Sequence, residues 1–221
     1  MRRKLIALVV LALATSPARS HFIWIVPDAS NGDLMRVVFS DKLEPDDQVA
    51  IEKIAGTRLL VRNASGKNAP LTWSKGEHAY LINLPEERTV VVGGTCRYGV
   101  SQRGGSKPFL LLYYPKAIRG AVQDAKMGDQ LPMEIVPQGK SQFQVLFGGK
   151  PVSNAEVVVL PPDGKEQTLS SNAQGKFQLK APAKGGFFGI RARFIEPKSG
   201  ELDGKKYEEI RHYATLVMRI E

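Results

Sequence analysis

The sequence predicts an all-β protein with two β-sandwich domains that follow a cleaved signal peptide. Three observations favour this class: a charged and then apolar segment opens the chain, short β-branched and aromatic runs fill the remainder, and Gly, Pro, Asn and Asp separate those runs. The expected boundaries are 1–20 for the signal peptide, 21–120 for the first domain and 121–221 for the second. One larger sandwich with long insertions is the alternative.

The first twenty residues have the three parts of an export signal. Cations occupy positions 2–4, residues 5–14 are apolar, and Ala18 and Ser20 fit the small-x-small rule for cleavage after Ser20. The apolar run has about ten residues, roughly half of what a membrane-spanning helix needs. A cut after Ala14 and an uncleaved anchor are the alternatives. Cleavage after Ser20 would make His21 the first residue of the mature protein.

Charge and cysteine content narrow the classes of function. The formal net charge is +9, and the four cations of the signal account for part of it, which leaves about +5 on the mature chain. Lys and Arg are scattered and are not interleaved with aromatic residues, so nucleic-acid binding has little support. Cys96 is the only cysteine, so no internal disulfide is expected. No later segment is long and apolar enough to cross a membrane, which predicts a periplasmic or secreted protein without an integral membrane segment.

The first domain is expected to contain six strands. Their residue ranges are 22–27, 34–41, 57–64, 78–85, 88–94 and 108–117. Residues 45–55 form the best helical candidate, because the proline would stand in the first turn, where a missing N–H costs nothing. Residues 120–129 are small and polar and are expected to link the two halves.

The second domain is expected to contain six more strands. Their ranges are 131–137, 141–149, 155–164, 176–182, 185–197 and 208–220. Several of these runs alternate polar and apolar residues, as half-buried strands do. Asp163-Gly164 and Gln174-Gly175 stand at hairpin positions. Residues 197–206 read as a charged loop that contains glycine.

The chain has three histidines, and the position of His21 makes it the most informative. A histidine at a free N-terminus offers its α-amine and its imidazole Nδ1, which can chelate one metal ion together. The amine has an ordinary pKa of about 7.7–8.0, so its proton is displaced at modest cost near neutral pH. One distant imidazole would complete a three-nitrogen site, the histidine brace. His212, in a β-rich run, is the first candidate for that ligand, and His78 is the second.

The donor set favours copper, with nickel as the alternative, because all-nitrogen tetragonal sites suit both ions and copper binds more tightly. The third residue of the mature chain is Ile23, so the binding mode that needs a histidine there is absent. Cys96 is either a buried, inert thiol or a soft copper ligand. Three polar residues flank apolar strands and are candidates for orienting the metal ligands: Asp41, Tyr98 and Tyr213.

Other common chemistries lack a sequence signature. The chain contains no G-x-S-x-G, no P-loop and no H-E-x-x-H motif. The carboxylates are dispersed, and no pair stands out for glycoside hydrolysis.

Three segments carry a family resemblance. The HFIW that follows the signal, CRYGV with the following GGSKPFLLLYYPKA, and RHYATL near the end stand in an order that resembles the exported domain-of-unknown-function 4198 proteins. That family includes members associated with nickel or cobalt uptake, so the resemblance implies a periplasmic metal-binding role. It implies no established reaction.

A second resemblance covers residues 149–182. The GKPVSNAE turn and the later NAQGKF segment are similar to prealbumin-like and carboxypeptidase-regulatory-like sandwiches, in which Ala155 lies under the sheet and Phe177 fills the core. The expected fold is therefore two immunoglobulin/prealbumin-like β-sandwich domains.

These observations predict a periplasmic protein that binds copper or nickel through His21 and His212, with His78 or Cys96 as further ligands, and that buffers the ion or delivers it to an envelope transporter. Two alternatives stay open. One is a copper enzyme resembling lytic polysaccharide monooxygenases, although no flat aromatic platform for a polysaccharide is evident. The other is a metal-free envelope module that binds protein or glycan.

Overall fold

The computed structural model describes residues 20–84, 90–120, 125–139, 141–180 and 185–220. Most of the expected signal peptide lies outside these residues. Among the described residues, no helix has the length and apolar character needed to cross a membrane. The regular secondary structure of the described residues is almost entirely β-strand, which confirms the predicted all-β class.

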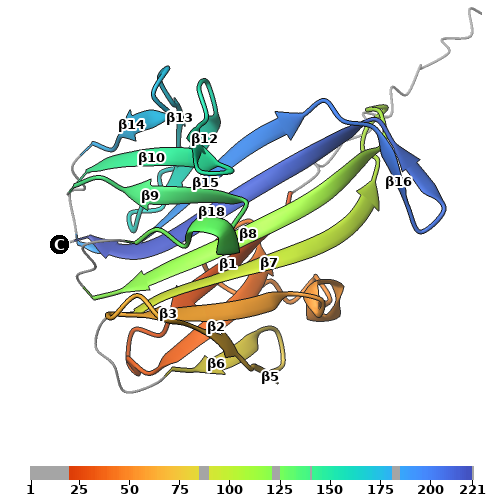
Figure 1. The fold of residues 1–221 in the computed structure, drawn as a ribbon. Helices are drawn as coiled ribbons and strands as arrows, with labels where there is room; N and C mark the ends of the chain where they lie inside the picture. Colours follow the sequence, from red (N-terminus) through yellow and green to blue (C-terminus); the bar gives the residue numbers. More distant parts are fainter. Residues whose placement is uncertain (1–19, 85–89, 121–124, 140, 181–184, 221) are drawn as a thin grey trace, which may run out of the picture.

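An eight-stranded sheet forms the centre of the molecule and takes strands from both halves of the sequence. In spatial order the strands are β13 (Gln167–Ser170), β12 (Glu156–Leu160), β15 (Gly186–Glu196), β18 (Glu209–Ile220), β8 (Phe109–Arg119), β7 (Val90–Ser101), β3 (Arg58–Asn63) and β4 (Asn68–Leu71). The last strand, β18, runs parallel to β8, while the other neighbours are antiparallel. The sheet is thus continuous across the expected boundary at residue 120 (Figure 1).

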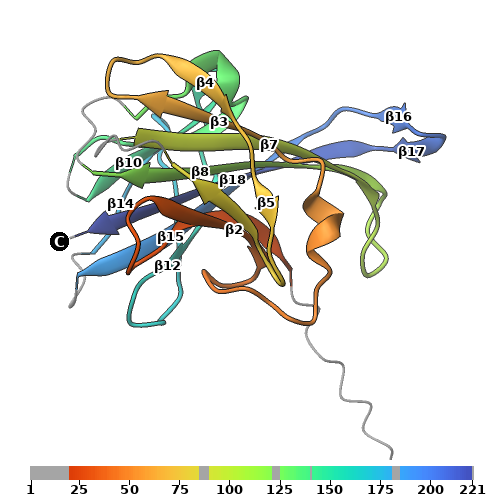
Figure 2. The ribbon, with the colours of Figure 1, turned by 90° about the horizontal axis from the view of Figure 1, so that it is seen from below.

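A four-stranded sheet, here called sheet A, packs on one face of the central sheet. Its order is β1 (Phe22–Pro27), β2 (Leu34–Ser40), β6 (Tyr80–Asn83) and β5 (Ser74–Lys75). All residues of β1 except Val26 are buried, and Trp24 is fully buried in the first hydrophobic core. β1 crosses β8 and β18, so the residues next to the expected cleavage site lie against the middle of the molecule (Figures 1 and 2).

A smaller sheet, here called sheet C, packs on the opposite face. Its central strand β10 (Gln142–Phe147) pairs with β9 (Met133–Pro137) along one edge, and with β11 (Lys150–Pro151) and β14 (Lys176–Gln178) along the other. Phe143 and Phe177 stack with their ring centroids 5.5 Å apart in the second core. Ala155 is buried in this core, as the prealbumin-like turn implied.

Alternation along β8 separates the two cores. Tyr113 faces sheet A and belongs to the first core, while Tyr114 faces sheet C and belongs to the second. Successive residues of a strand point to opposite faces, so the same parity assigns β18: Val217 faces sheet A, and Leu216 faces sheet C. The fold is therefore a three-layer β-sandwich with the central sheet in the middle.

Residues 197–206, expected to be a loop, instead contribute to a hairpin. β16 (Gly200–Leu202) pairs with β17 (Lys205–Tyr207) around Asp203 and Gly204, whose φ angles are 49° and 73°. Two successive positive φ angles are what a two-residue hairpin turn requires, and Asp-Gly is a preferred pair for it. The hairpin projects from one end of the central sheet (Figure 1).

The expected helix over residues 45–55 is wrong. Only a single turn of 3₁₀-helix forms, η1 (Ile51–Ile54), which buries two isoleucines. The carboxylate of Asp46 accepts the backbone N–H of Gln48 at 2.9 Å, so this segment forms a side-chain turn where a helix would need backbone bonds. A second short turn, η2 (Gly128–Gln130), overlaps the end of the expected linker over residues 120–129.

Candidate functional site

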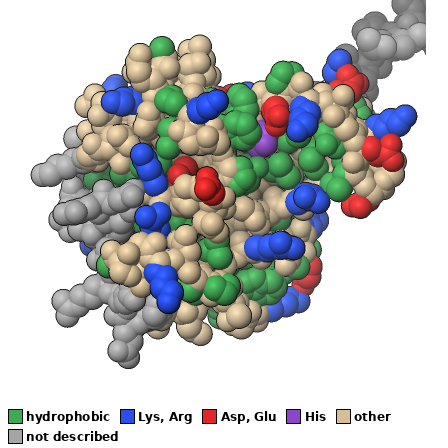
Figure 3. Space-filling model, viewed as in Figure 1, with side chains coloured by type: hydrophobic (Ala, Val, Ile, Leu, Met, Phe, Trp, Pro, Cys, Tyr) green, Lys and Arg blue, Asp and Glu red, His purple; other side chains and the backbone are tan. Residues whose placement is uncertain are grey.

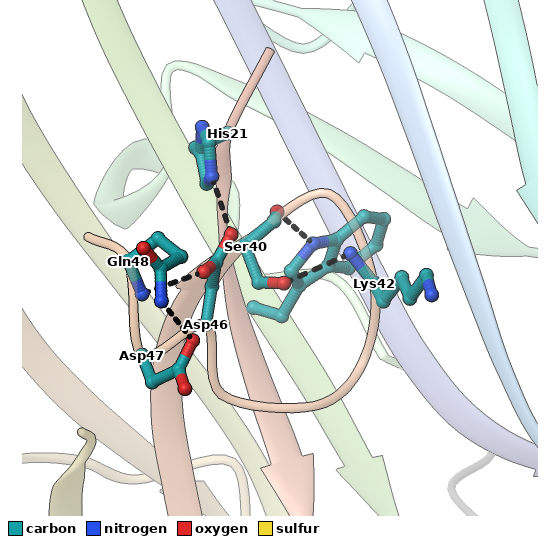
Figure 4. A network of polar contacts seen from close by, with 7 residues as sticks. His21, Ser40, Lys42, Asp46, Asp47 and Gln48 are labelled. Atoms are coloured by element: carbon teal, nitrogen blue, oxygen red, sulfur yellow. Dashed lines mark hydrogen bonds and ion pairs between the residues drawn. The ribbon is translucent and has the colours of Figure 1, made fainter. Parts of the chain in front are cut away.

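His21 lies directly before β1 and is held by a carboxylate from a turn distant in sequence. Its Nε2 is 2.8 Å from Oδ2 of Asp46, and the two side chains are 17% and 16% exposed. The other oxygen of Asp46 accepts the N–H of Gln48, which fixes the direction of the carboxylate (Figure 4). An ionised carboxylate only accepts hydrogen bonds, so Nε2 of the neutral ring carries the hydrogen and Nδ1 keeps its lone pair.

Aromatic rings surround the backbone of His21 on the sheet A side. The phenol of Tyr113 donates a hydrogen bond to the carbonyl of His21 at 3.0 Å. Phe39 lies 5.6 Å from the imidazole and 5.6 Å from the ring of Tyr98. Tyr213 lies 5.9 Å from Tyr113, so Tyr98 and Tyr213, both expected near the site, belong to this aromatic cluster. Burial raises the pKa of the Tyr113 phenol, which keeps it protonated as a donor.

Two further candidates share the end of sheet A at which His21 lies. β1 begins at Phe22, opposite Ser40, and Asp41 immediately follows Ser40 at the end of β2. β6 also runs antiparallel to β2 and begins at Tyr80, two residues after His78. His21 and His78 therefore precede strands that flank β2 at the same end. The His78 side chain is 41% exposed, and its Nε2 is 3.6 Å from a carboxylate oxygen of Glu77.

His212 lies on the other face of the central sheet. The residue is 3% exposed, with Nδ1 2.9 Å from the phenol oxygen of Tyr114 and Nε2 3.2 Å from Oε2 of Glu196. Tyr114 stacks on the imidazole at a centroid distance of 5.9 Å. Burial lowers the pKa of His212, against the opposing effect of Glu196. The pairing of His21 with His212 on one ion is therefore not a geometry that this fold presents, because the sheet stands between them.

Cys96 lies in the first core and is 3% exposed. Its partner across the ladder is Tyr113. Burial raises the pKa of the thiol, while a hydrogen bond with Thr57 opposes that effect. The neutral thiol is the form that this environment favours, and it is a poor metal ligand.

Among the described residues, no group of three or more His, Cys, Asp or Glu side chains is arranged to hold a metal ion. The α-amine that cleavage after Ser20 would create is a donor outside that count. In the uncut chain, Arg103 donates a hydrogen bond to the hydroxyl of Ser20 at 2.9 Å.

Sequence reasoning missed the residues that hold each histidine. Asp46 stood inside the expected helix, and its signal was the Asp-Asp pair after Pro45, which is typical of a side-chain turn. Tyr113 and Tyr114 were visible as a pair on one strand, and alternation placed them on opposite faces. Nothing in the sequence indicated that Tyr113 would contact His21 and that Tyr114 would contact His212.

Comparisons with known proteins leave the family open. No protein-family model matches the chain, and no curated protein matches it. One similar solved structure is a tetra-tandem repeat from the extending region of a large adhesion protein, with 13% identity and a TM-score of 0.25; the match covers 90% of this chain and 49% of that one. Another is the BSP domain of a biofilm-associated protein, with 12% identity and a TM-score of 0.19 over 88% of this chain and 29% of that one. This chain spans about half or less of each, and TM-scores this low support no argument from these structures.

Proposed function

We propose that the protein is an exported metal-binding protein whose site forms at His21 once the signal peptide is removed. The α-amine and Nδ1 of His21 would chelate Cu(II), or less tightly Ni(II), and the protein would buffer the ion or pass it to an envelope transporter. The resemblance to the domain-of-unknown-function 4198 proteins points to the same class of role.

The contact between Nε2 of His21 and Asp46 carries the proposal. A histidine that binds a metal through one ring nitrogen commonly donates the other N–H to a carboxylate, which fixes the tautomer and the ring orientation. Here the carboxylate of Asp46 is the hydrogen-bond partner of Nε2 of His21. The nitrogen that remains is Nδ1, the only ring nitrogen able to close a chelate with the α-amine of the same residue.

The remaining donors would come from the end of sheet A that carries His21. At that end, Asp41 follows β2 and His78 precedes β6. Mixed nitrogen and oxygen donors in a tetragonal arrangement suit Cu(II) and Ni(II), and copper leads by the usual order of affinities. His78 replaces His212 as the preferred third nitrogen, because His212 is buried on the opposite face.

The test compares two forms of the secreted protein that differ by one residue. The first begins at His21, and the second carries one glycine before His21, which moves the amine out of the chelate. Competition titration should give a Cu(II) affinity that is lower by several orders of magnitude for the second form, with an unchanged melting temperature. Equal affinities would overturn the proposal.

Substitutions at Asp46 and at His78 examine the site, each with a matched control. Asp46→Asn should weaken Cu(II) binding roughly ten- to hundredfold, because the amide no longer fixes the hydrogen on Nε2. Asp47→Asn is the matched control, an exposed carboxylate one residue away, and should change nothing. His78→Ala should lower the affinity while His212→Gln leaves it unchanged, and the reverse result would restore His212 as the ligand.

A further inference from the structure

A cavity of about 490 Å³ lies on the face of the central sheet opposite to His21. Its floor is formed by residues of β8 that point away from sheet A, namely Leu110, Leu112 and Tyr114. Leu202 and Tyr207 of the β16–β17 hairpin form one wall, and Pro132 lies on another side. The long central strands extend past the short strands of sheet C, so sheet C leaves this part of the face uncovered. Hydrophobic side chains are visible between sheet C and the hairpin (Figure 3).

Two opposite charges line this apolar cavity. Arg97 is the ladder partner of Leu112 and therefore projects from the same face of the sheet, and Glu201 belongs to the hairpin. Both side chains are exposed, and neither takes part in an ion pair with another described residue. An unpaired guanidinium favours a carboxylate, and an unpaired carboxylate favours an ammonium group.

We infer that the cavity binds a short apolar peptide with free ends, of two or three residues. The apolar floor and the two tyrosines would take the side chains, Arg97 the terminal carboxylate and Glu201 the terminal ammonium. The volume falls within the range of small-molecule sites, and an apolar lining with a few convergent polar groups is their usual character. A fatty acid could pair its carboxylate with Arg97 but has no ammonium group to pair with Glu201. The two opposite charges therefore favour a peptide with both ends free.

The position of Tyr114 provides a readout that is separate from metal binding. Tyr114 lines the cavity, and its hydroxyl contacts Nδ1 of His212. A ligand on the floor should therefore shift the NMR signals of Tyr114 and His212. Signals of Phe39 and Tyr98, on the sheet A face, should stay in place.

The experiment titrates the isotope-labelled mature protein with the dipeptide Leu-Phe and follows chemical shifts. We expect saturable shifts at the cavity with a Kd of about 0.1 mM, which is within ligand-efficiency bounds for a ligand of this size. The N-acetylated and C-amidated dipeptides should each bind about fivefold more weakly, as loss of a partly exposed ion pair predicts. No shift at 5 mM, or equal binding of the doubly blocked dipeptide, would overturn the inference.

Variants assign each charge to its partner. Arg97→Gln should weaken the binding of Leu-Phe but not that of C-amidated Leu-Phe. Glu201→Gln should weaken the binding of Leu-Phe but not that of N-acetylated Leu-Phe. Asp203→Asn is the matched control, because it removes a carboxylate from the turn of the same hairpin while asparagine tolerates the positive φ. Decanoate binding more tightly than Leu-Phe, or shifts that depend only on protein concentration, would assign the cavity to a lipid or to a second copy and overturn the inference.

Discussion

His21 and His212 differ in how many of their ring nitrogens have hydrogen-bond partners among the described residues. The partners of His21 occupy Nε2 and the backbone carbonyl, so Nδ1 is the nitrogen left for a ligand. The partners of His212 occupy both ring nitrogens, and aromatic rings close around it, with Phe147 at 4.7 Å. Among the described residues, His21 thus has a partner at one ring nitrogen, whereas His212 has partners at both.

The environment of His212 predicts a pH-dependent stability. Burial lowers its pKa in the folded state below the ordinary 6.5, so the unfolded chain takes up a proton first as the pH falls. This contribution to stability is fully present above pH 6.5 and is lost as the pH drops through and below that value. Urea unfolding at pH 7.5, 6.5 and 5.5 should show this slope, and His212→Gln should flatten it. The exposed histidine variant His78→Gln is the control, and a slope that it alone removes would contradict this account.

The hydrogen bond from Tyr113 to the carbonyl of His21 predicts a second effect at this scale. Tyr113→Phe keeps the ring in the aromatic cluster and removes only the hydroxyl. We expect a loss of about 1 kcal/mol in the free energy of unfolding, the typical net value of one hydrogen bond. Tyr98→Phe is the matched control from the same cluster. Chemical denaturation measures both, and equal losses would show that the bond to His21 is not the cause.

At the scale of elements, a buried ion pair fastens the segment between β8 and β9. Nζ of Lys116 is 2.8 Å from Oε2 of Glu134, and both side chains are almost fully buried. The same carboxylate accepts the backbone N–H groups of Met127 and Gly128, so it fixes the turn η2 against the central sheet. The expected linker is in this way tied to the core by one side chain.

Removing one partner of this pair leaves a buried charge uncompensated. Lys116→Met and Glu134→Gln should each lower the free energy of unfolding by about 3–5 kcal/mol. The double variant should recover a large part of the loss, because neither buried charge remains and the Gln carbonyl can still accept the backbone N–H of Met127. A double-mutant cycle by urea denaturation measures this coupling, and strictly additive losses would show that the pair does not act as a unit.

At the scale of the whole molecule, β18 joins the two halves of the sequence. It pairs with β15 from the second half on one side and with β8 from the first half on the other. Neither half therefore completes the central sheet without the other. The position of β18 also places His212 on the side of the second core, whereas its neighbour Tyr213 packs against the first core.

This continuity predicts a single cooperative unfolding transition. Calorimetry of the mature protein should give one peak, with the calorimetric enthalpy equal to the van't Hoff enthalpy, as a two-state unit requires. A chain ending at residue 208 lacks β18 and should show no cooperative transition. Two resolved peaks in the full mature protein would instead show that the halves unfold as independent domains.

The local features of this protein follow from its amino-acid sequence. Alternating apolar residues and Gly, Pro and Asn-rich turns specified most strands and the sandwich class, because these signals depend only on neighbours in the chain. The small-x-small pattern of Ala18 and Ser20 before His21 is likewise a property of the local sequence. The insertion of β18 beside β8, the separation of His21 from His212 by the central sheet, and the contact of Asp46 with His21 are evident from the tertiary structure alone. These contacts join residues far apart in sequence, and their geometry follows from how the strands pair and which face each side chain takes.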